Sequence, residues 1–290
     1  MTARKISLLA NLHKSEALPT ARMVIARLRK AGVEVLLRRD LAEALGERDG
    51  EADFYHDADM VLCLGGDGTL LTAVRALEGR EIPILGINLG GLGFLTAVPS
   101  NEVDSCLEAV LAGDCRIEER RLIKATTREP GGEPLVLHAF NDIVVDEGSF
   151  TRRAVVLKMS IDHSYVGTFT ADGLIVATPT GSTAYALSAG GPIVHPSLPA
   201  LVVTPVCAHS LSIRPLVFGD GEIVQIENLL PDVAIKITAD GQDAHVVGPE
   251  MPVHVSLSER KVLLAFVGRR PYSEIMRTKL TWGGIPQNPC

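Results

Sequence analysis

Short apolar runs alternate with helix-like stretches over the first 115 residues of the chain. The runs have the length of buried strands and cover residues 6–10, 33–37, 60–64 and 83–88. Between them, apolar residues recur every three or four positions, most regularly over residues 18–29 and 101–111, which is the spacing of one helix face. Strands that alternate with helices predict a parallel sheet covered by helices.

The pattern changes near residue 116, after which short apolar runs follow one another with few helices between them. Strands are predicted at residues 116–127, 135–146, 154–162, 164–169, 174–178, 202–206, 222–227, 233–239, 253–257 and 262–266. Many short strands separated by turn residues are typical of a β-sandwich or a related layered sheet domain. We therefore expect an α/β N-terminal domain with a parallel sheet and a mainly β, sandwich-like C-terminal domain.

The domain boundaries follow from the same change of pattern. Residues 1–119 are expected to form the α/β domain and residues 120–266 the β-rich domain. A helix-like segment at residues 272–279 is expected to return to the first domain, so that residues from about 267 to 290 complete it. With 290 residues, of which 46% are apolar and 22% charged, the chain is long enough for two such cores.

The composition argues against some classes of partner and favours one cellular compartment. The net charge of −7 argues against nucleic-acid binding through a broad basic face. No apolar run reaches about 18 residues, so no membrane span is expected, and the run after the basic N-terminus is too short for a signal peptide. The five cysteines are odd in number and include no Cys-x-x-Cys pair, which favours reduced thiols in a cytoplasmic protein.

The run at residues 60–64 leads into Gly65-Gly66-Asp67-Gly68-Thr69, a glycine-rich turn before a helix that is predicted to start at Thr69. Glycines let the backbone approach a ligand closely, and the N–H groups of such a turn can bind anionic oxygens. A carboxylate repels phosphate, so Asp67 is expected to accept a proton from a hydroxyl that attacks a phosphoryl group, or to orient that hydroxyl. The simpler alternative is a tight turn in which Asp67 only caps the helix.

A second glycine-rich loop follows the next predicted strand, at residues 88–95. Because the carboxyl ends of parallel strands lie at one edge of a sheet, the two loops should converge on one crevice. The chain has neither a Walker sequence nor Gly-x-Gly-x-x-Gly after its first strand. Binding of a phosphate donor is therefore expected to rest on these loops and on a divalent metal, Mg²⁺.

The stretch at residues 178–192, among the C-terminal strands, is rich in small and hydroxyl-bearing residues. Gly181 and Ser182 can open a helix over residues 183–189, and the free N–H groups of its start are suited to one wall of a ligand site. By composition alone, a purely structural helix start is the better explanation.

Gly65–Thr69 resembles the signature of a kinase superfamily that comprises NAD kinases, diacylglycerol-type lipid kinases and, more loosely, 6-phosphofructokinases. Residues 178–192 resemble the most distinctive motif of the NAD kinases, which the lipid kinases lack. Further pieces resemble that family in order and spacing, at residues 86–95, 139–142, 171–174, 204–215 and 239–242. The resemblance extends from about residue 5 to about residue 270.

The resemblance implies a two-domain kinase that uses ATP to phosphorylate the 2′-hydroxyl of the adenosine ribose of NAD, giving NADP. Asp67 is then the catalytic base. The implied NAD contacts are Asp67, Gly68, Phe94, Asn141, Asp142, Arg152, Asp172, Thr183, Ala184, Tyr185, Ala186, Leu187, Ser188 and Gln242. Asp172 often reaches NAD from a neighbouring subunit in this family, so a homodimer or homotetramer is also implied.

Two other functions stay open on the sequence. A lipid or other small-alcohol kinase on the same scaffold would share the first motif, although no apolar substrate entrance is identifiable. A non-catalytic NAD-sensing protein would keep the pocket, but the intact Asp67 argues against it. The sequence also departs from the family at Asp142, where many bacterial members have Glu, and the shorter side chain can weaken or reroute one hydrogen bond.

Overall fold

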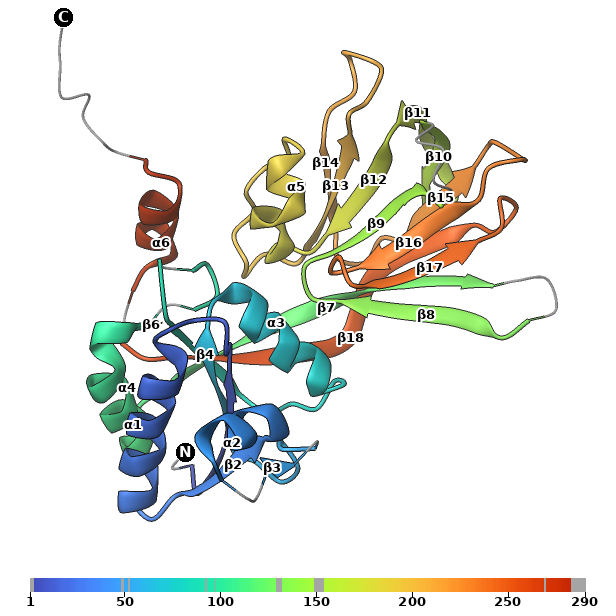
Figure 1. The fold of residues 1–290 in the computed structure, drawn as a ribbon. Helices are drawn as coiled ribbons and strands as arrows, with labels where there is room; N and C mark the ends of the chain where they lie inside the picture. Colours follow the sequence, from blue (N-terminus) through green and yellow to red (C-terminus); the bar gives the residue numbers. More distant parts are fainter. Residues whose placement is uncertain are drawn as a thin grey trace, which may run out of the picture. The chain divides into compact units, whose positions relative to one another are not determined.

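The computed structural model describes residues 3–47, 50–51, 53–91, 93–96, 98–128, 132–148, 154–268 and 270–282. Contacts divide this part of the chain into two units: unit 1 contains residues 3–119 and 262–282, and unit 2 contains residues 120–261. Strands β7 (Arg116–Arg128) and β18 (Val253–Phe266) each begin in one unit and end in the other (Figure 1).

Unit 1 is built on a parallel sheet with the strand order β3-β2-β1-β4-β5. Its strands are β1 (Lys5–Ala10), β2 (Glu34–Arg38), β3 (Gly50–Glu51), β4 (Met60–Gly65) and β5 (Ile84–Asn88), and both the short β6 (Val98–Pro99) and the end of β18 pair with β5. The chain runs from β1 outward to β2 and β3, then returns to β4 on the other side of β1. Ligands bind beyond the carboxyl ends of the strands at such a reversal.

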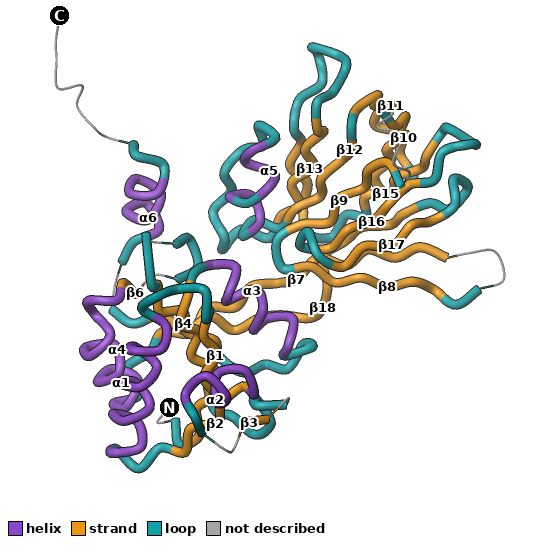
Figure 2. Tube along the Cα trace, in the orientation of Figure 1, coloured by secondary structure: helices purple, strands orange, loops and turns teal. Residues whose placement is uncertain are grey.

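Helices cover both faces of this sheet. They are α1 (Ala17–Lys30), α2 (Arg39–Leu45), α3 (Asp67–Ala76) and α4 (Val103–Ala112), with a 3-10 turn (Ser100–Glu102) before α4 (Figure 2). A further helix, α6 (Tyr272–Lys279), follows β18. Helices α1, α2 and α4 share one apolar cluster with Leu8, Leu62 and Leu85 of the sheet. Helix α3 packs on the opposite face, because Leu70 lies against Gly86, whose neighbours in β5 point into that cluster. None of the helices in the described residues is long and apolar enough to cross a membrane.

Helix α3 begins at Asp67, earlier than the start predicted at Thr69. Gly66 is the extended residue before the helix, and its N–H donates a hydrogen bond to Thr69 Oγ1 (3.3 Å). Asp67 and Gly68 are therefore the first residues of the helix rather than part of the loop. A carboxylate is favoured at this end of a helix, where the helix dipole is positive.

Unit 2 is an antiparallel sandwich. One layer has the order β14-β13-β12-β9-β16-β17, and the other contains β11, β10, β15, β18, β7 and β8. Their bounds are β8 (Pro134–Ala139), β9 (Asp142–Glu147), β10 (Val155–Ile161), β11 (Ser164–Ala171), β12 (Gly173–Ala177), β13 (Ala200–Val206), β14 (Leu216–Gly219), β15 (Val224–Asn228), β16 (Ile235–Ala239) and β17 (Asp243–Val247). Inward-facing residues of both layers form one apolar core, which includes Ile143, Leu157, Val176 and Val253.

The predicted fold class is confirmed, but several predicted strands differ from the structure. Residues 135–146, predicted as one strand, form β8 and β9 with a break at Phe140 and Asn141. Residues 253–257 and 262–266 belong to one strand, β18, because the polar residues between them stay extended with exposed side chains at Glu259 and Arg260. Strands β14 and β17 were not predicted, since both lie at sheet edges and lack a run of buried apolar residues.

A short helical segment covers the outer face of β12 and β13. It consists of a 3-10 turn (Gly181–Thr183) and α5 (Tyr185–Ser188), so the single helix predicted over residues 183–189 is split and shorter. Ala186 packs against Ile175 and Val202 of the sheet. A Cβ on Gly181 would overlap the carbonyl group of Asn141, so only glycine allows the segment to approach the start of β9 this closely.

Leu62 of β4 tests the packing of unit 1. Its side chain is fully buried, whereas the Leu211 side chain is 93% exposed. Leu62→Ala should lower the free energy of unfolding by about 2–5 kcal/mol because it leaves a cavity, and Leu211→Ala should change it by less than about 0.5 kcal/mol. Urea denaturation measures both values. Equal effects of the two substitutions would contradict this packing.

Candidate active site

The two glycine-rich loops of unit 1 meet at the carboxylate of Asp67. The N–H of Phe94 donates to its Oδ2 (2.9 Å), and the N–H groups of Leu95 and Thr96 donate to its Oδ1 (both 3.1 Å). The hydroxyl of Thr96 also donates to Oδ1 (3.0 Å). The convergence predicted from the strand order is confirmed. Asp67 also does more than cap its own helix, since its hydrogen bonds reach the loop after β5.

The glycines around this carboxylate fall into two kinds. A Cβ on Gly93 would overlap both the Asp67 carboxylate and the Thr96 hydroxyl, so the contact requires glycine. A Cβ on Gly66 or Gly68 would meet no atom of the described residues within 4 Å. The turn is therefore open at these two residues, which leaves room for a ligand at the N-terminus of α3.

Lys14 was not predicted, although it lies at the same end of the sheet. It follows β1, and the strand order reverses between β1 and β4. A Cβ on Gly90 would come within 3.4 Å of Lys14 Nζ, so the ammonium group lies beside the second glycine-rich loop. The signal that could have identified it is a basic residue shortly after the first predicted strand. The crevice thus has a cation next to loops suited to anions.

Unit 2 contains a hollow of about 360 Å³ on the outer face of β9 and β16. It brings together four of the predicted contacts, Asn141, Asp142, Ala184 and Tyr185. The other lining residues are Val144, Asp146, Lys236, Thr238, Asp240 and Gly241. A hollow of this size, with polar groups and an exposed aromatic ring, is typical of a site for part of a small-molecule ligand.

Asp240 holds the start of β9 in place. Its carboxylate accepts hydrogen bonds from the N–H groups of Phe140 (2.8 Å), Asn141 (2.7 Å) and Asp142 (3.2 Å). Asp240 and Gly241 both have left-handed backbone angles, with φ of 48° and 67°. The turn was recognised in the sequence, but Gln242 was selected from it and Asp240 was missed. These hydrogen bonds explain why the predicted strand 135–146 breaks into β8 and β9.

Asp142 lies in a setting that disfavours its charged form. Its side chain is 4% exposed. Burial and the neighbouring Asp240 carboxylate raise its pKa to about 7, against the opposing effect of a hydrogen bond from the Tyr185 N–H. A carboxyl that exchanges its proton near neutral pH is common at functional sites.

The remaining predicted contacts do not line the hollow of unit 2. In unit 1, Gly68 lies in the first turn of α3, and Phe94 lies in the loop after β5. Ala186 is fully buried against the sheet of unit 2, and Arg152 lies outside the described residues. Side chains that are exposed or half-buried are those of Asp172, Thr183, Leu187, Ser188 and Gln242.

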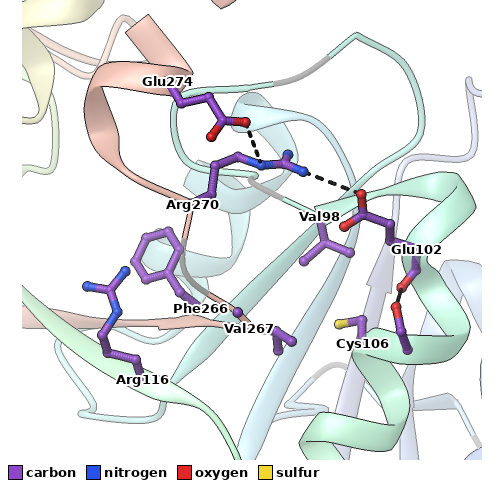
Figure 3. A pocket seen from close by; sticks show the side chains of 10 residues that line it. Val98, Glu102, Cys106, Arg116, Phe266, Val267, Arg270 and Glu274 are labelled. Atoms are coloured by element: carbon purple, nitrogen blue, oxygen red, sulfur yellow. Dashed lines mark hydrogen bonds and ion pairs between the residues drawn. The ribbon is translucent and has the colours of Figure 1, made fainter.

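Unit 1 also contains a hollow, of about 190 Å³ (Figure 3). None of the predicted NAD contacts is among its lining residues. Arg270 lies between two carboxylates, with Nη2 3.3 Å from Glu102 Oε1 and Nε 3.6 Å from Glu274 Oε1. The Arg116 guanidinium group lies 5.3 Å from the centre of the Phe266 ring. Arg270 thus links the start of α6 to the turn before α4. We interpret the residues around this hollow as structural rather than as a ligand site.

Comparison with known proteins identifies the family. The sequence profile of the ATP-NAD kinase N-terminal domain matches residues 6–115, and that of the ATP-NAD kinase C-terminal domain matches residues 140–267. The NAD kinase of Syntrophotalea carbinolica is 40% identical over 287 residues, which cover 97% of this chain and 99% of that protein. The chain belongs to the ATP-NAD kinase family. The resemblance inferred from the motifs is therefore confirmed.

A second relative and two solved structures are also similar to this chain. The NAD kinase of Geobacter metallireducens is 41% identical over 286 residues, 97% of this chain and 99% of that protein. Yeast NADH kinase complexed with NADH has a TM-score of 0.89 at 23% identity, covering 100% of this chain and 90% of that one. An NAD kinase from Archaeoglobus fulgidus in complex with ATP has a TM-score of 0.74 at 22% identity, covering 96% and 97%. At these identities the two structures establish a shared fold.

Asp142 should make this NAD kinase less stable as the pH rises. An unfolded Asp loses its proton near pH 4, whereas the folded Asp142 has a pKa of about 7. Between these values the folded state binds more protons than the unfolded state, so the free energy of unfolding falls with rising pH and levels off above about pH 7. Asp142→Asn removes this dependence. The Tm of the variant minus the Tm of the parent should therefore increase as the pH rises from about 5 to about 8. A Tm difference that stays constant in thermal melts over this range would contradict a buried neutral carboxyl.

Proposed function

We propose that this member of the ATP-NAD kinase family transfers a phosphoryl group from ATP to the 2′-hydroxyl of the adenosine ribose of NAD, giving NADP, with Asp67 as the general base. Membership of the family supports ATP and NAD as the substrates. The observation that carries the residue assignment is the Asp67 carboxylate, which is held between two glycine-rich loops where the strand order of the sheet reverses.

Asp67 suits the role of proton acceptor for chemical reasons. Phosphoryl transfer has a loose transition state, in which positioning and charge neutralisation supply most of the catalysis. A hydroxyl that attacks phosphorus must lose its proton as the new bond forms, and a nearby carboxylate can accept it. Backbone N–H groups already hold Asp67 in place, so the acceptor does not have to be ordered when substrate binds.

For the phosphate donor, we propose that the loops of unit 1 bind the phosphates of ATP and that Lys14 offsets their charge. Among the described residues, no group of three His, Cys, Asp or Glu side chains is placed to hold a metal ion. This fits a Mg²⁺ ion that arrives with ATP and takes its ligands largely from phosphate and water oxygens. Bound in this way, Mg²⁺ would neutralise charge on the reacting phosphates.

For the phosphate acceptor, we propose that the hollow of unit 2 binds part of NAD. The Asn141 amide and the Asp142 carboxyl offer hydrogen bonds to ribose or amide groups, and the Tyr185 ring offers a stacking surface. Asp172 is exposed, and we propose that it reaches NAD bound by a neighbouring copy. The other proposed contacts are Gly68, Phe94, Arg152, Thr183, Ala184, Ala186, Leu187, Ser188 and Gln242.

We also propose that the protein is a homodimer or homotetramer in the cytoplasm. Within the described sheet, β14 and β17 each pair on one side only, and open strand edges of this kind pair with other chains. Four cysteines, Cys63, Cys106, Cys115 and Cys207, are free thiols, which fits a reducing compartment.

Asp67→Asn tests the proposed base. The variant should lose roughly 10²–10⁴-fold in kcat, because an amide cannot accept the proton, while NAD still binds. NADP is measured with an NADP-specific dehydrogenase after incubation with ATP, Mg²⁺ and NAD, and NAD binding is measured by calorimetry. Full activity of the variant would remove Asp67 from the mechanism. NAD binding by a folded parent that makes no NADP would instead favour a sensing protein.

Lys14→Gln tests the proposed donor contact. The substitution should raise the KM for ATP roughly tenfold, because it removes a charged hydrogen-bond donor, and should leave the KM for NAD nearly unchanged. Lys30→Gln is the matched control, since Lys30 is an exposed lysine in the last turn of α1. Steady-state kinetics with each substrate varied in turn measure both constants. Equal behaviour of the two variants would exclude Lys14 from ATP binding.

A further inference from the structure

Asn88 and Thr96 are buried polar residues beside Asp67. Asn88 is the last residue of β5 and is 4% exposed, and Thr96, in the loop after β5, is fully buried. The side-chain amide of Asn88 donates from Nδ2 to Thr96 Oγ1 (2.7 Å). The Thr96 hydroxyl then donates to Asp67 Oδ1 (3.0 Å). The three side chains form a chain of hydrogen bonds that ends on the carboxylate.

The chemistry of the groups fixes the direction of this chain. The Nδ2 group of an amide only donates, so it occupies a lone pair of the Thr96 hydroxyl. A hydroxyl has one proton, and that proton is then available for Asp67. Asn88 therefore determines which way the Thr96 hydroxyl points, although Asn88 itself does not contact the carboxylate.

The surrounding backbone leaves room for Thr96 only because two residues are glycines. A Cβ on Gly86 would lie 2.5 Å from the Thr96 methyl carbon Cγ2. A Cβ on Gly93 would overlap the Thr96 hydroxyl and the Asp67 carboxylate. Side chains at these positions would push Thr96 away from Asp67. The strand on one side and the loop on the other are thus both shaped around this threonine.

The two oxygens of Asp67 are bonded unequally. Oδ1 accepts three hydrogen bonds, from the N–H groups of Leu95 and Thr96 and from the Thr96 hydroxyl. Among the described residues, Oδ2 accepts one, from the N–H of Phe94. A carboxylate oxygen has two lone pairs, so Oδ1 is fully occupied, whereas the donors of the described residues leave one position free on Oδ2.

We propose that Asn88 and Thr96 are positioning residues for Asp67: by binding Oδ1 they direct Oδ2 at the attacking hydroxyl. This inference rests on the proposed role of Asp67 as the base. As the bond from the ribose oxygen to phosphorus forms, the hydroxyl proton passes to Oδ2. The bond from phosphorus to the leaving oxygen breaks, and its electron pair departs with ADP. Oδ1 keeps its three hydrogen bonds throughout.

Thr96→Val is the first test, because valine has nearly the same shape and lacks the hydroxyl. The kcat should fall roughly ten- to a hundredfold, the loss expected for one hydrogen bond to a charged group, while both KM values change by less than about threefold. Thr96→Ser keeps the hydroxyl and should restore most of kcat. Asn88→Ala leaves the hydroxyl free to rotate and should lower kcat in the same direction by a smaller factor.

A double-mutant cycle separates positioning from a merely structural role. In the Asp67→Asn background, Thr96→Val should cost less than about threefold in the remaining kcat, because no proton acceptor is left to direct. A structural role would cost the same factor in both backgrounds. Thr127→Val is the matched control: Thr127 is a buried threonine of β7, and its substitution should leave kcat and both KM values unchanged.

The outcomes distinguish this inference from the proposed function. If Asp67→Asn loses activity but Thr96→Val keeps the parent's kcat, the positioning role is overturned and the base remains. If Asp67→Asn keeps full activity, the proposed base fails and the positioning role fails with it. If Thr96→Val does not fold, Asn88→Ala and Thr96→Ser decide the matter, and an Asn88→Ala variant with unchanged kcat overturns the role of Asn88.

Discussion

A carboxylate that receives backbone N–H groups from a distant loop organises the candidate site in each unit. In unit 1, Asp67 binds the N–H groups of residues 94–96, and in unit 2, Asp240 binds those of residues 140–142. Hydrogen bonds to a charged acceptor are short and strong. Several on one carboxylate can hold a loop that neither a helix nor a sheet ladder would order. The geometry of both candidate binding regions depends on these contacts.

This way of ordering a loop has an electrostatic cost in unit 2. Burial of Asp142 raises its pKa most, and the nearby Asp240 charge adds to this effect, so that the pKa is about 7. Removing a carboxylate from water and placing it beside a like charge both disfavour ionisation. Asp142 lines the hollow of unit 2, where the disfavoured ionisation accompanies a fixed position of the start of β9. The same reasoning applies to Gly93 and Gly181, which lose more conformational entropy than other residues but permit close approach.

Much of the fold could be predicted from the sequence because local patterns were strong. β4 is buried on both faces and appears as an unbroken apolar run, and α1 buries one clear helical face. The missed elements lack such patterns. β17 is exposed at four of its five positions, so no alternation marks it. The break between β8 and β9 depends on Asp240, about a hundred residues further along the chain, and local sequence does not contain that information.

The sequence by itself determined which residues form the turn after β4, and its resemblance to the NAD kinases named Asn141, Asp142 and Tyr185 as candidates, because motifs record residue type and local spacing. Only the tertiary structure decided what surrounds these groups. The hydrogen bonds from Phe94, Leu95 and Thr96 to Asp67 cross 27 to 29 positions of sequence. Lys14 reaches the second glycine-rich loop from the segment that follows β1. Such contacts depend on strand order and on close approach at glycines, which are set when the sheet assembles.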